Sequence, residues 1–319
     1  MANSLLVETI ASVIASAAPL VFAGVGETIT EKVGITNLSL DGSILLSAMA
    51  GFAAAMLSGS LLVGVITAML VGALVAGIVA TGSIALRQDQ VAVGFVLTVL
   101  CTALSSFLGK PYVRVPGPSM PHLPIPYLAD IPVIGPIFFN HDLLVYLSYV
   151  VIFGTVFLFN RTQLGLRLRA VGERPEAAFA RGINVNRYRY LFTCLGGALV
   201  GLGGATFSLS VKLGWSYQHT AGFGWIALAI VIFGGWNPLR VALGAYLFGA
   251  LNSLASILQP AFPTVPTQVF QTAPFAFMIL TLLIMNGDVL ERLPRGSRWL
   301  RKLLQGQAPA GLGKRFQSD

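Results

Sequence analysis

The sequence predicts an all-α fold, a polytopic transmembrane helical bundle of eight or nine spans. Of its 319 residues, 55% are hydrophobic and only 10% are charged, and the mean hydropathy is +0.79. An ordinary soluble domain has roughly 25% charged residues, so this chain could not cover a surface in water. None of its apolar runs alternates with the period of two residues that a membrane β-strand requires. The composition therefore indicates an integral membrane protein built from helices.

The apolar runs set the expected spans, because a helix needs about 20 mostly apolar residues to cross a bilayer. These runs cover residues 5–26, 34–57, 61–85, 91–108, 141–160, 190–211, 223–236, 239–258 and 269–286. The seventh run is about 21 Å long at 1.5 Å per residue. It is either a full span or a half-helix that does not cross alone. Residues 110–140 hold eight of the 17 prolines, which predicts an extended loop or short turns.

Basic residues orient the predicted spans. A nine-span layout puts 17 of the 20 Lys and Arg on one side, including seven Arg between 161 and 190. Because basic loops stay in the cytoplasm, we expect the N-terminus outside and the C-terminus inside a plasma (inner) membrane. The domains are then a transmembrane domain, 1–290, with a cytoplasmic segment at about 161–189, and a basic cytoplasmic tail, 291–319. The net charge of +8 thus reflects membrane topology rather than nucleic-acid binding, and the expected partners include membrane lipid but no nucleic acid.

The sequence has no motif for catalysis. The three His are scattered, the two Cys lie in separate apolar runs, and neither a metal-ligand spacing nor a phosphate-binding loop occurs. We predict that the chain is not an enzyme and has no catalytic residue, no metal site and no cofactor. If ATP drives its activity, another chain must bind the ATP.

A short capped helix is predicted between the fifth and sixth runs. Residues Glu173 to Arg181 are polar around a central pair of alanines. Pro175 suits the first turn of a helix, Glu176 the positive end of its dipole, and Gly182 its end. The residues alone leave two interpretations open. The helix either docks a soluble partner or lies on the surface and is held by anionic lipid.

This segment resembles the coupling segment of ABC importer permeases of the branched-chain amino acid, sugar and nucleoside superfamily. The family pattern G-x-N-x-x-A-A-x-x-x-G-I is matched at Gly172, Ala177, Ala178, Gly182 and Ile183. Arg174 stands where Asn is frequent. Residues 26–42 and 224–238 are similar to two further patterns of the nucleoside-type permeases, with Asp41 replacing the usual Glu.

The resemblance implies a fold of the ABC importer permease type and a permease that moves a small polar solute. Nucleosides are the expected cargo, and branched-chain amino acids or sugars are the alternatives. The implied partners are two ATP-binding cassette subunits, which bind the ATP, a second homologous permease subunit and an extracytoplasmic substrate-binding lipoprotein. The implied ATPase-coupling residues are Gly172, Glu173, Arg174, Pro175, Glu176, Ala177, Ala178, Arg181, Gly182 and Ile183.

A secondary transporter is the rival function. A proton could drive such a carrier through Asp41 or Glu8, which both lie within expected spans. A carrier of this kind has no use for a capped docking helix on its cytoplasmic face. The segment at 161–189 therefore favours the ATP-driven importer.

Polar residues within the spans and a helix break predict the translocation pathway. Asn37 and Asp41 lie four residues apart and are expected on one face of the second helix. A carboxylate in a span costs about 2.5–3.5 kcal/mol, so Asp41 either lines the pathway or bonds to a neighbouring helix end. We favour the bond to a helix end. The break at 234–238 is tolerated only where it is buried or lines water. The expected pathway residues are Asn37, Asp41, Gly42, Trp225, Trp236 and Asn237.

Small and aromatic residues predict how the helices pack. The glycine-rich stretch 196–204 allows another helix to approach closely. Four aromatic residues gather near the expected external boundary: Trp215, Tyr217, Phe223 and Trp225. We expect them to form a belt at the lipid headgroups, with a stacking surface for a nucleobase as the alternative.

Overall fold

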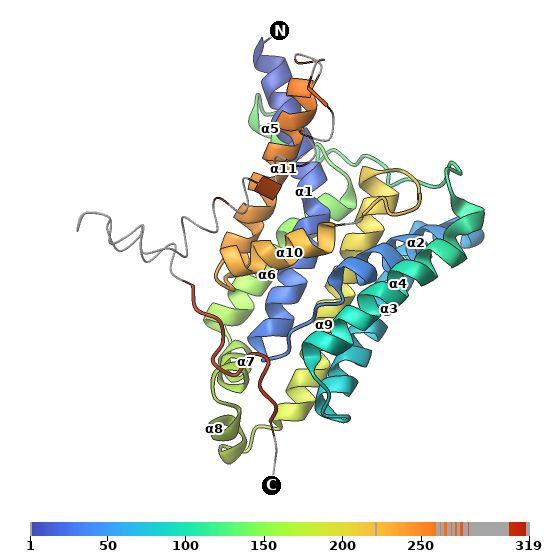
Figure 1. Cartoon of the computed structure of the whole chain (residues 1–319). Helices are drawn as coiled ribbons and strands as arrows, with labels where there is room; N and C mark the ends of the chain where they lie inside the picture. The colour runs from blue at the N-terminus through green and yellow to red at the C-terminus, as the bar shows by residue number, and fades with distance from the viewer. Residues whose placement is uncertain are drawn as a thin grey trace.

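The described part of the chain is all-helical, which confirms the predicted fold class (Figure 1). The computed structural model describes residues 2–220, 222–259 and 306–316, together with single residues between 262 and 280. Within these residues, six helices are long and apolar enough to cross a membrane. The expected ninth span, 269–286, and the first part of the expected tail lie outside the continuous described ranges.

The six long apolar helices follow the first six expected spans. They are α1 (Ala2–Lys32), α2 (Leu40–Ser58), α3 (Leu61–Ile84), α4 (Gln90–Gly109), α6 (Leu143–Arg161) and α9 (Val185–Thr206). A turn of π-helix, η2 (Phe207–Val211), extends α9. The seventh expected span corresponds to α10 (Phe223–Phe233), which has only 11 residues, and α11 (Pro238–Leu258) follows it after the break.

Short elements lie at the two ends of the bundle. The proline-rich loop contains only η1 (Lys110–Tyr112) and α5 (Ile134–Phe138), as its composition predicts. Between α6 and α9 lie α7 (Gln163–Glu173) and α8 (Pro175–Ala180). Figure 1 shows α7 and α8 at the end of the bundle opposite the N-terminus.

Basic residues lie at both ends of the described bundle. The backbone N–H of Arg114 donates to Trp215 O at 3.1 Å, which brings the proline-rich loop beside the segment after η2. Lys32, Arg169 and Arg240 line one polar cavity at the opposite end. Which of the two ends faces the cytoplasm stays a prediction.

The core of the bundle surrounds α9, which packs against α1, α2 and α3. Glycines make these contacts very close: a Cβ at Gly197 would lie 2.5 Å from Gly72 O on α3, and a Cβ at Gly26 on α1 would lie 2.5 Å from Gly196 O. On the third side, a Cβ at Gly204 would lie 2.7 Å from Ile44 O on α2. These contacts confirm the predicted close approach at the glycine-rich stretch. It is possible because glycine has no side chain to keep the two backbones apart.

Candidate functional site

Local capping residues build the segment between α6 and α9. Thr162 Oγ1 accepts a hydrogen bond from Gly165 N at 3.0 Å and so begins α7. Pro175 is the first residue of α8, with Glu176 in its first turn. Gly182 follows α8 with φ of 80°, a left-handed conformation that suits glycine. The expected short helix is present, although it ends at Ala180.

One face of α8 packs on the molecule and the other is exposed. Pro175 and Ala178 are buried, whereas the Phe179 side chain is 46% exposed. Among the other residues expected to couple to an ATPase, Gly172 is buried, Ile183 is half-buried, and the exposed ones are Glu173, Arg174, Glu176, Ala177, Arg181 and Gly182. The exposed residues between Glu173 and Gly182 thus form a small projection with charged and apolar side chains, here called the knob.

The knob is tied to α1 and α9. Gly172 has no side chain, so the carbonyl oxygen of Lys32, at the end of α1, contacts its backbone closely. Asn184 Oδ1 accepts a hydrogen bond from Arg187 N at 3.0 Å and begins α9. Leu168, on α7 itself, is fully buried. These contacts hold α7 and α8 as a defined structure rather than as a loose loop.

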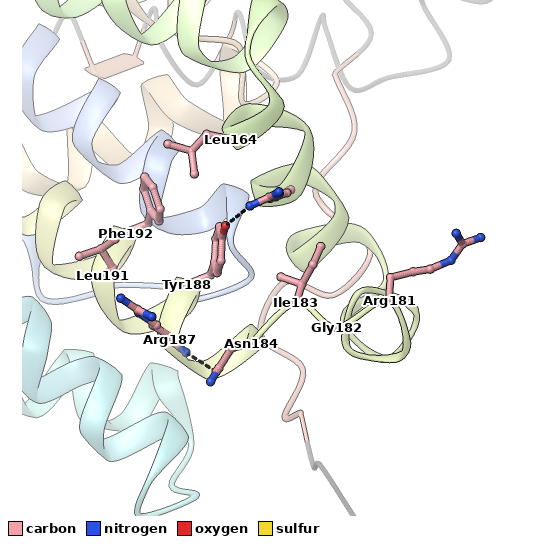
Figure 2. Close-up of a pocket in the computed structure, with 10 residues that line it drawn as sticks. Leu164, Arg181, Gly182, Ile183, Asn184, Arg187, Tyr188, Leu191 and Phe192 are labelled. Atoms are coloured by element: carbon pink, nitrogen blue, oxygen red, sulfur yellow. Dashed lines mark hydrogen bonds between the residues drawn. The ribbon is translucent and has the colours of Figure 1, made fainter.

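A cavity of about 630 Å³ lies between α7 and the start of α9 (Figure 2). Arg167 Nη1 donates a hydrogen bond to the Tyr188 hydroxyl on its wall at 3.4 Å. Arg181 points away from the cavity in Figure 2, whereas Leu191 and Phe192 form an apolar wall. Arg167 and Arg187 line it and none of the described carboxylates does, so the cavity attracts anions.

Two buried carboxyl groups on α1 were missed by the sequence analysis. Glu27 is fully buried, and its Oε1 accepts a hydrogen bond from Asn37 N at 3.0 Å. Trp236 Nε1 donates to Glu31 Oε2. The first span was expected to end at residue 26, but α1 continues to Lys32 because these carboxyl groups find buried partners. The signal was their spacing of four residues, which places both on one helix face.

The prediction that Asn37 and Asp41 share a helix face is wrong. Asn37 lies in the turn between α1 and α2, because α2 begins at Leu40 rather than at residue 34. Gly34, with φ of 89°, ends α1. The Asn37 side chain then accepts hydrogen bonds from Ser39 N at 3.1 Å and Ser39 Oγ at 2.6 Å. Such local side-chain bonds compete with the helix and favour a turn.

Asp41 joins the start of α2 to the start of α10. Its Oδ1 accepts hydrogen bonds from Gly222 N at 2.8 Å and from Gly224 N at 3.0 Å. A carboxylate here also complements the positive end of the α10 dipole. Asp41 thus makes the bond to a neighbouring helix end that the structural alternative requires.

We predict that the Asp41 carboxyl is needed for stability mainly as a hydrogen-bond acceptor. Asp41→Asn keeps an acceptor oxygen, so its midpoint of thermal unfolding should stay close to that of the natural chain. Asp41→Ala removes the acceptor and should lower the free energy of unfolding by about 1–2 kcal/mol. Thermal denaturation of the purified chain in detergent measures both. An equal loss of stability in the two variants would contradict this role. In a separate transport measurement, unchanged solute uptake by Asp41→Asn would exclude a role of the Asp41 charge in the pathway.

The other expected pathway residues occupy different places. Gly42 packs on α4, where a Cβ would lie 2.5 Å from Thr98 O, and Trp225 is 40% exposed. Asn237 Oδ1 accepts from Leu239 N at 3.0 Å and so begins α11. Trp236 and Asn237 both line a cavity of about 270 Å³ at the break between α10 and α11. The structure thus brings this pair together and places Gly42 in a helix–helix contact.

Trp215 is a buried anchor, which corrects its expected place in an aromatic belt. Its side chain is 2% exposed and lies against Gly109 at the end of α4. The His219 ring packs edge-on to it at 6.1 Å, and burial lowers the pKa of the His219 imidazole. Phe223 likewise packs edge-on against Phe207 at 4.6 Å, whereas Tyr217 is 49% exposed. Trp215 is shielded because the chain after η2 folds back onto the end of α4.

Comparison with known proteins decides the family. Residues 9–285 match the family model described as the permease component of the branched-chain amino acid transport system. The chain belongs to this ABC permease family. The permease is thus a multi-pass membrane protein that carries out no catalysis itself, and no solved structure matches it.

Three relatives of this permease are named as transporters of small solutes. It is 34% identical to a putative glucose ABC transporter permease of Haloferax volcanii, over 88% of this chain and 85% of that protein. It is 32% identical to a nucleoside ABC transporter permease of Lactococcus lactis, over 92% and 96% of the two chains. It is 33% identical to a guanosine ABC transporter permease of Bacillus subtilis, over 86% and 89%.

Proposed function

We propose that this permease carries nucleosides through an ATP-driven importer in the plasma membrane. Two of the three relatives above are named for nucleoside or guanosine transport, and the alignment covers 96% of the Lactococcus lactis protein. The stretches at 26–42 and 224–238, which resemble the nucleoside-type permeases, meet in the structure where Asp41 binds Gly222 and Gly224. This contact supports the proposal, because the two stretches that resemble nucleoside-type permeases pack against each other although they are far apart in the sequence.

The exposed face of α8 is the observation that carries the ATP-driven mechanism. A soluble ATPase needs a rigid feature on which to push, and α8 is packed through Pro175 and Ala178 while Glu176 and Ala177 on its other side are exposed. We assign the residues from Gly172 to Ile183 to this contact. The full assembly has two ATPase subunits, a second permease subunit and an extracytoplasmic substrate-binding lipoprotein. In this arrangement α7 and α8 face the cytoplasm and the N-terminus lies outside.

A sugar is the alternative cargo. The identity of 34% with the putative glucose permease of Haloferax volcanii favours it. An exposed aromatic side chain such as Trp225 can stack on a flat base or on the apolar face of a sugar, so the aromatic residues do not separate the two. The choice of cargo depends on measurement.

Reconstitution of the whole importer tests the function. The assembly is purified through a tag on this permease, placed in liposomes with ATP inside the compartment that α8 faces, and supplied with labelled guanosine. We expect ATP-dependent uptake that excess uridine or adenosine reduces and that glucose or leucine leaves unchanged. Reduction by glucose alone would reassign the cargo to sugars. Uptake by the permease alone, driven by a proton gradient, would overturn the ATP-driven mechanism.

A further inference from the structure

The described part of the tail, residues 306–316, runs across the end of the bundle where α7 and α8 lie (Figure 1). It begins against the break between α10 and α11, where the Gly306 and Gly235 backbones touch; a Cβ at Gly306 would lie 2.7 Å from Gly235 O. Gly235 has φ of 58° there. This contact ties the tail to the cavity that Trp236 and Asn237 line.

The tail next binds the end of α7. Ala310 N donates a hydrogen bond to Glu173 Oε2 at 3.1 Å, and Gly311 N donates to Gly172 O at 2.8 Å. A Cβ at Gly311 would lie 2.6 Å from Gly172 O, so a side chain at this position would push the tail away. The tail thus contacts two of the residues assigned to the ATPase contact.

A buried arginine then joins the tail to α1 and α9. Arg189 is only 2% exposed; its Nε donates to Val33 O at 3.1 Å and its Nη1 to Lys314 O at 3.1 Å. Gly313 N donates to Gly34 O at 3.2 Å in the same place. Because a buried cation needs acceptors for its donors, the tail carbonyl lowers the cost of burying Arg189.

The tail reaches α8 itself at its last described residue. The Phe316 ring lies 5.6 Å from the Phe179 ring, centroid to centroid. α8 has six residues, too few to form a stable helix without outside contacts. Its own buried side chains, Pro175 and Ala178, are small. The ring of Phe316 therefore supplies a contact that α8 lacks within its own segment.

We propose that residues 306–316 are a strap that positions α7 and α8 on the body of the permease. The strap joins these helices to the α1–α2 turn, to α9 and to the break after α10. A push on α8 is then transmitted to the helices instead of tilting a loosely held knob. Gly311, Lys314 and Phe316 are positioning residues, since they act through the coupling segment. This role rests on the proposed function.

Spin labels report the position of α8 without any ATPase. Cys101 and Cys194 are first replaced, and labels are attached through Ala177→Cys on α8 and Gln88→Cys in the exposed turn after α3. The variants are a chain ending at residue 305, Gly311→Val and Phe316→Ala. The controls are a chain ending at Phe316 and Phe316→Tyr. We expect a narrow distance distribution in the controls and a broad one in the three variants.

Transport per ATP hydrolysed is the second measurement. Without the strap a push on α8 is partly lost as tilting of α8, so loss of the strap should lower the uptake of solute per ATP about tenfold while hydrolysis continues. Phe316→Tyr should restore the ratio that Phe316→Ala loses. A role in stability alone would lower uptake and hydrolysis together and would contradict the proposal.

The two proposals fail in different ways. If the chain ending at 305 shows the same distances and the same uptake per ATP as the full chain, the strap is overturned. If the full chain never supports ATP-dependent uptake, the proposed function fails, while the spin labels still test the strap. Should the shortened chain aggregate, Gly311→Val and Phe316→Ala decide, because each alters one contact in a complete chain.

Discussion

Gly72→Ala is expected to lower the free energy of unfolding of this permease by about 3 kcal/mol. A Cβ at Gly72 would lie 2.7 Å from Gly201 N and still nearer to Gly197 O, both in the backbone of α9. Backbone atoms cannot rotate aside as a flexible side chain can, so α3 and α9 must separate to admit the methyl group. Thermal denaturation in detergent, followed by the loss of monodisperse protein on size exclusion, measures the effect.

Gly77→Ala on the same helix is the matched control. A Cβ there would lie 3.4 Å from Cys194 Sγ, an ordinary contact. Because alanine favours a helix by about 1 kcal/mol over glycine, this variant should be as stable as the natural chain or slightly more so. Equal melting of the Gly72 and Gly77 variants would show that the close approach of α3 and α9 does not determine stability.

Ala177→Trp should reduce ATP-dependent uptake at least tenfold, about 1.4 kcal/mol or more of coupling, without unfolding the permease. Ala177 lies on the exposed side of α8, so an indole there fills the space that a docked ATPase subunit would occupy. Surface substitutions of this kind change stability by only about 0.5 kcal/mol. Uptake and ATP hydrolysis are measured in the reconstituted importer, and unfolding is measured in detergent.

The control for this experiment is Ala85→Trp in the exposed turn between α3 and α4. It adds the same ring to an exposed alanine outside the coupling segment. Uptake should persist in this variant. Loss of uptake in both variants would point to a general effect of the added indole ring. Normal uptake in Ala177→Trp would show that α8 does not contact the ATPase subunit.

Local patterns in the sequence predicted the elements well. A run of about 20 apolar residues has few alternatives in a membrane, so the six long helices follow from composition alone. Pro175 and Gly182 mark the ends of α8 through preferences that act over one helical turn. The ends of α1 and α2 differed from expectation for two reasons. Glu27 meets its partner, the backbone N–H of Asn37, only in the folded chain, and the Asn37 side chain bonds locally to Ser39 and favours a turn.

Contacts between distant parts of the chain could not be predicted in this way. Trp236 lies 205 residues after Glu31, and Arg189 reaches Lys314 across 125 residues. No periodicity connects such positions, because each side chain on its own is compatible with several surroundings. The burial of Trp215 has the same origin, since it depends on the way the segment after η2 folds onto α4.

The contacts of α9 on three sides determine how this subunit can move. Its glycines touch α1, α2 and α3 at backbone distance, and interlocked surfaces of this kind resist sliding. We therefore expect α1, α2, α3 and α9 to rotate as a single block when the translocation pathway opens to either side of the membrane. The hinge of that rotation then belongs at its margin, where Gly222, between η2 and α10, adopts a left-handed backbone conformation.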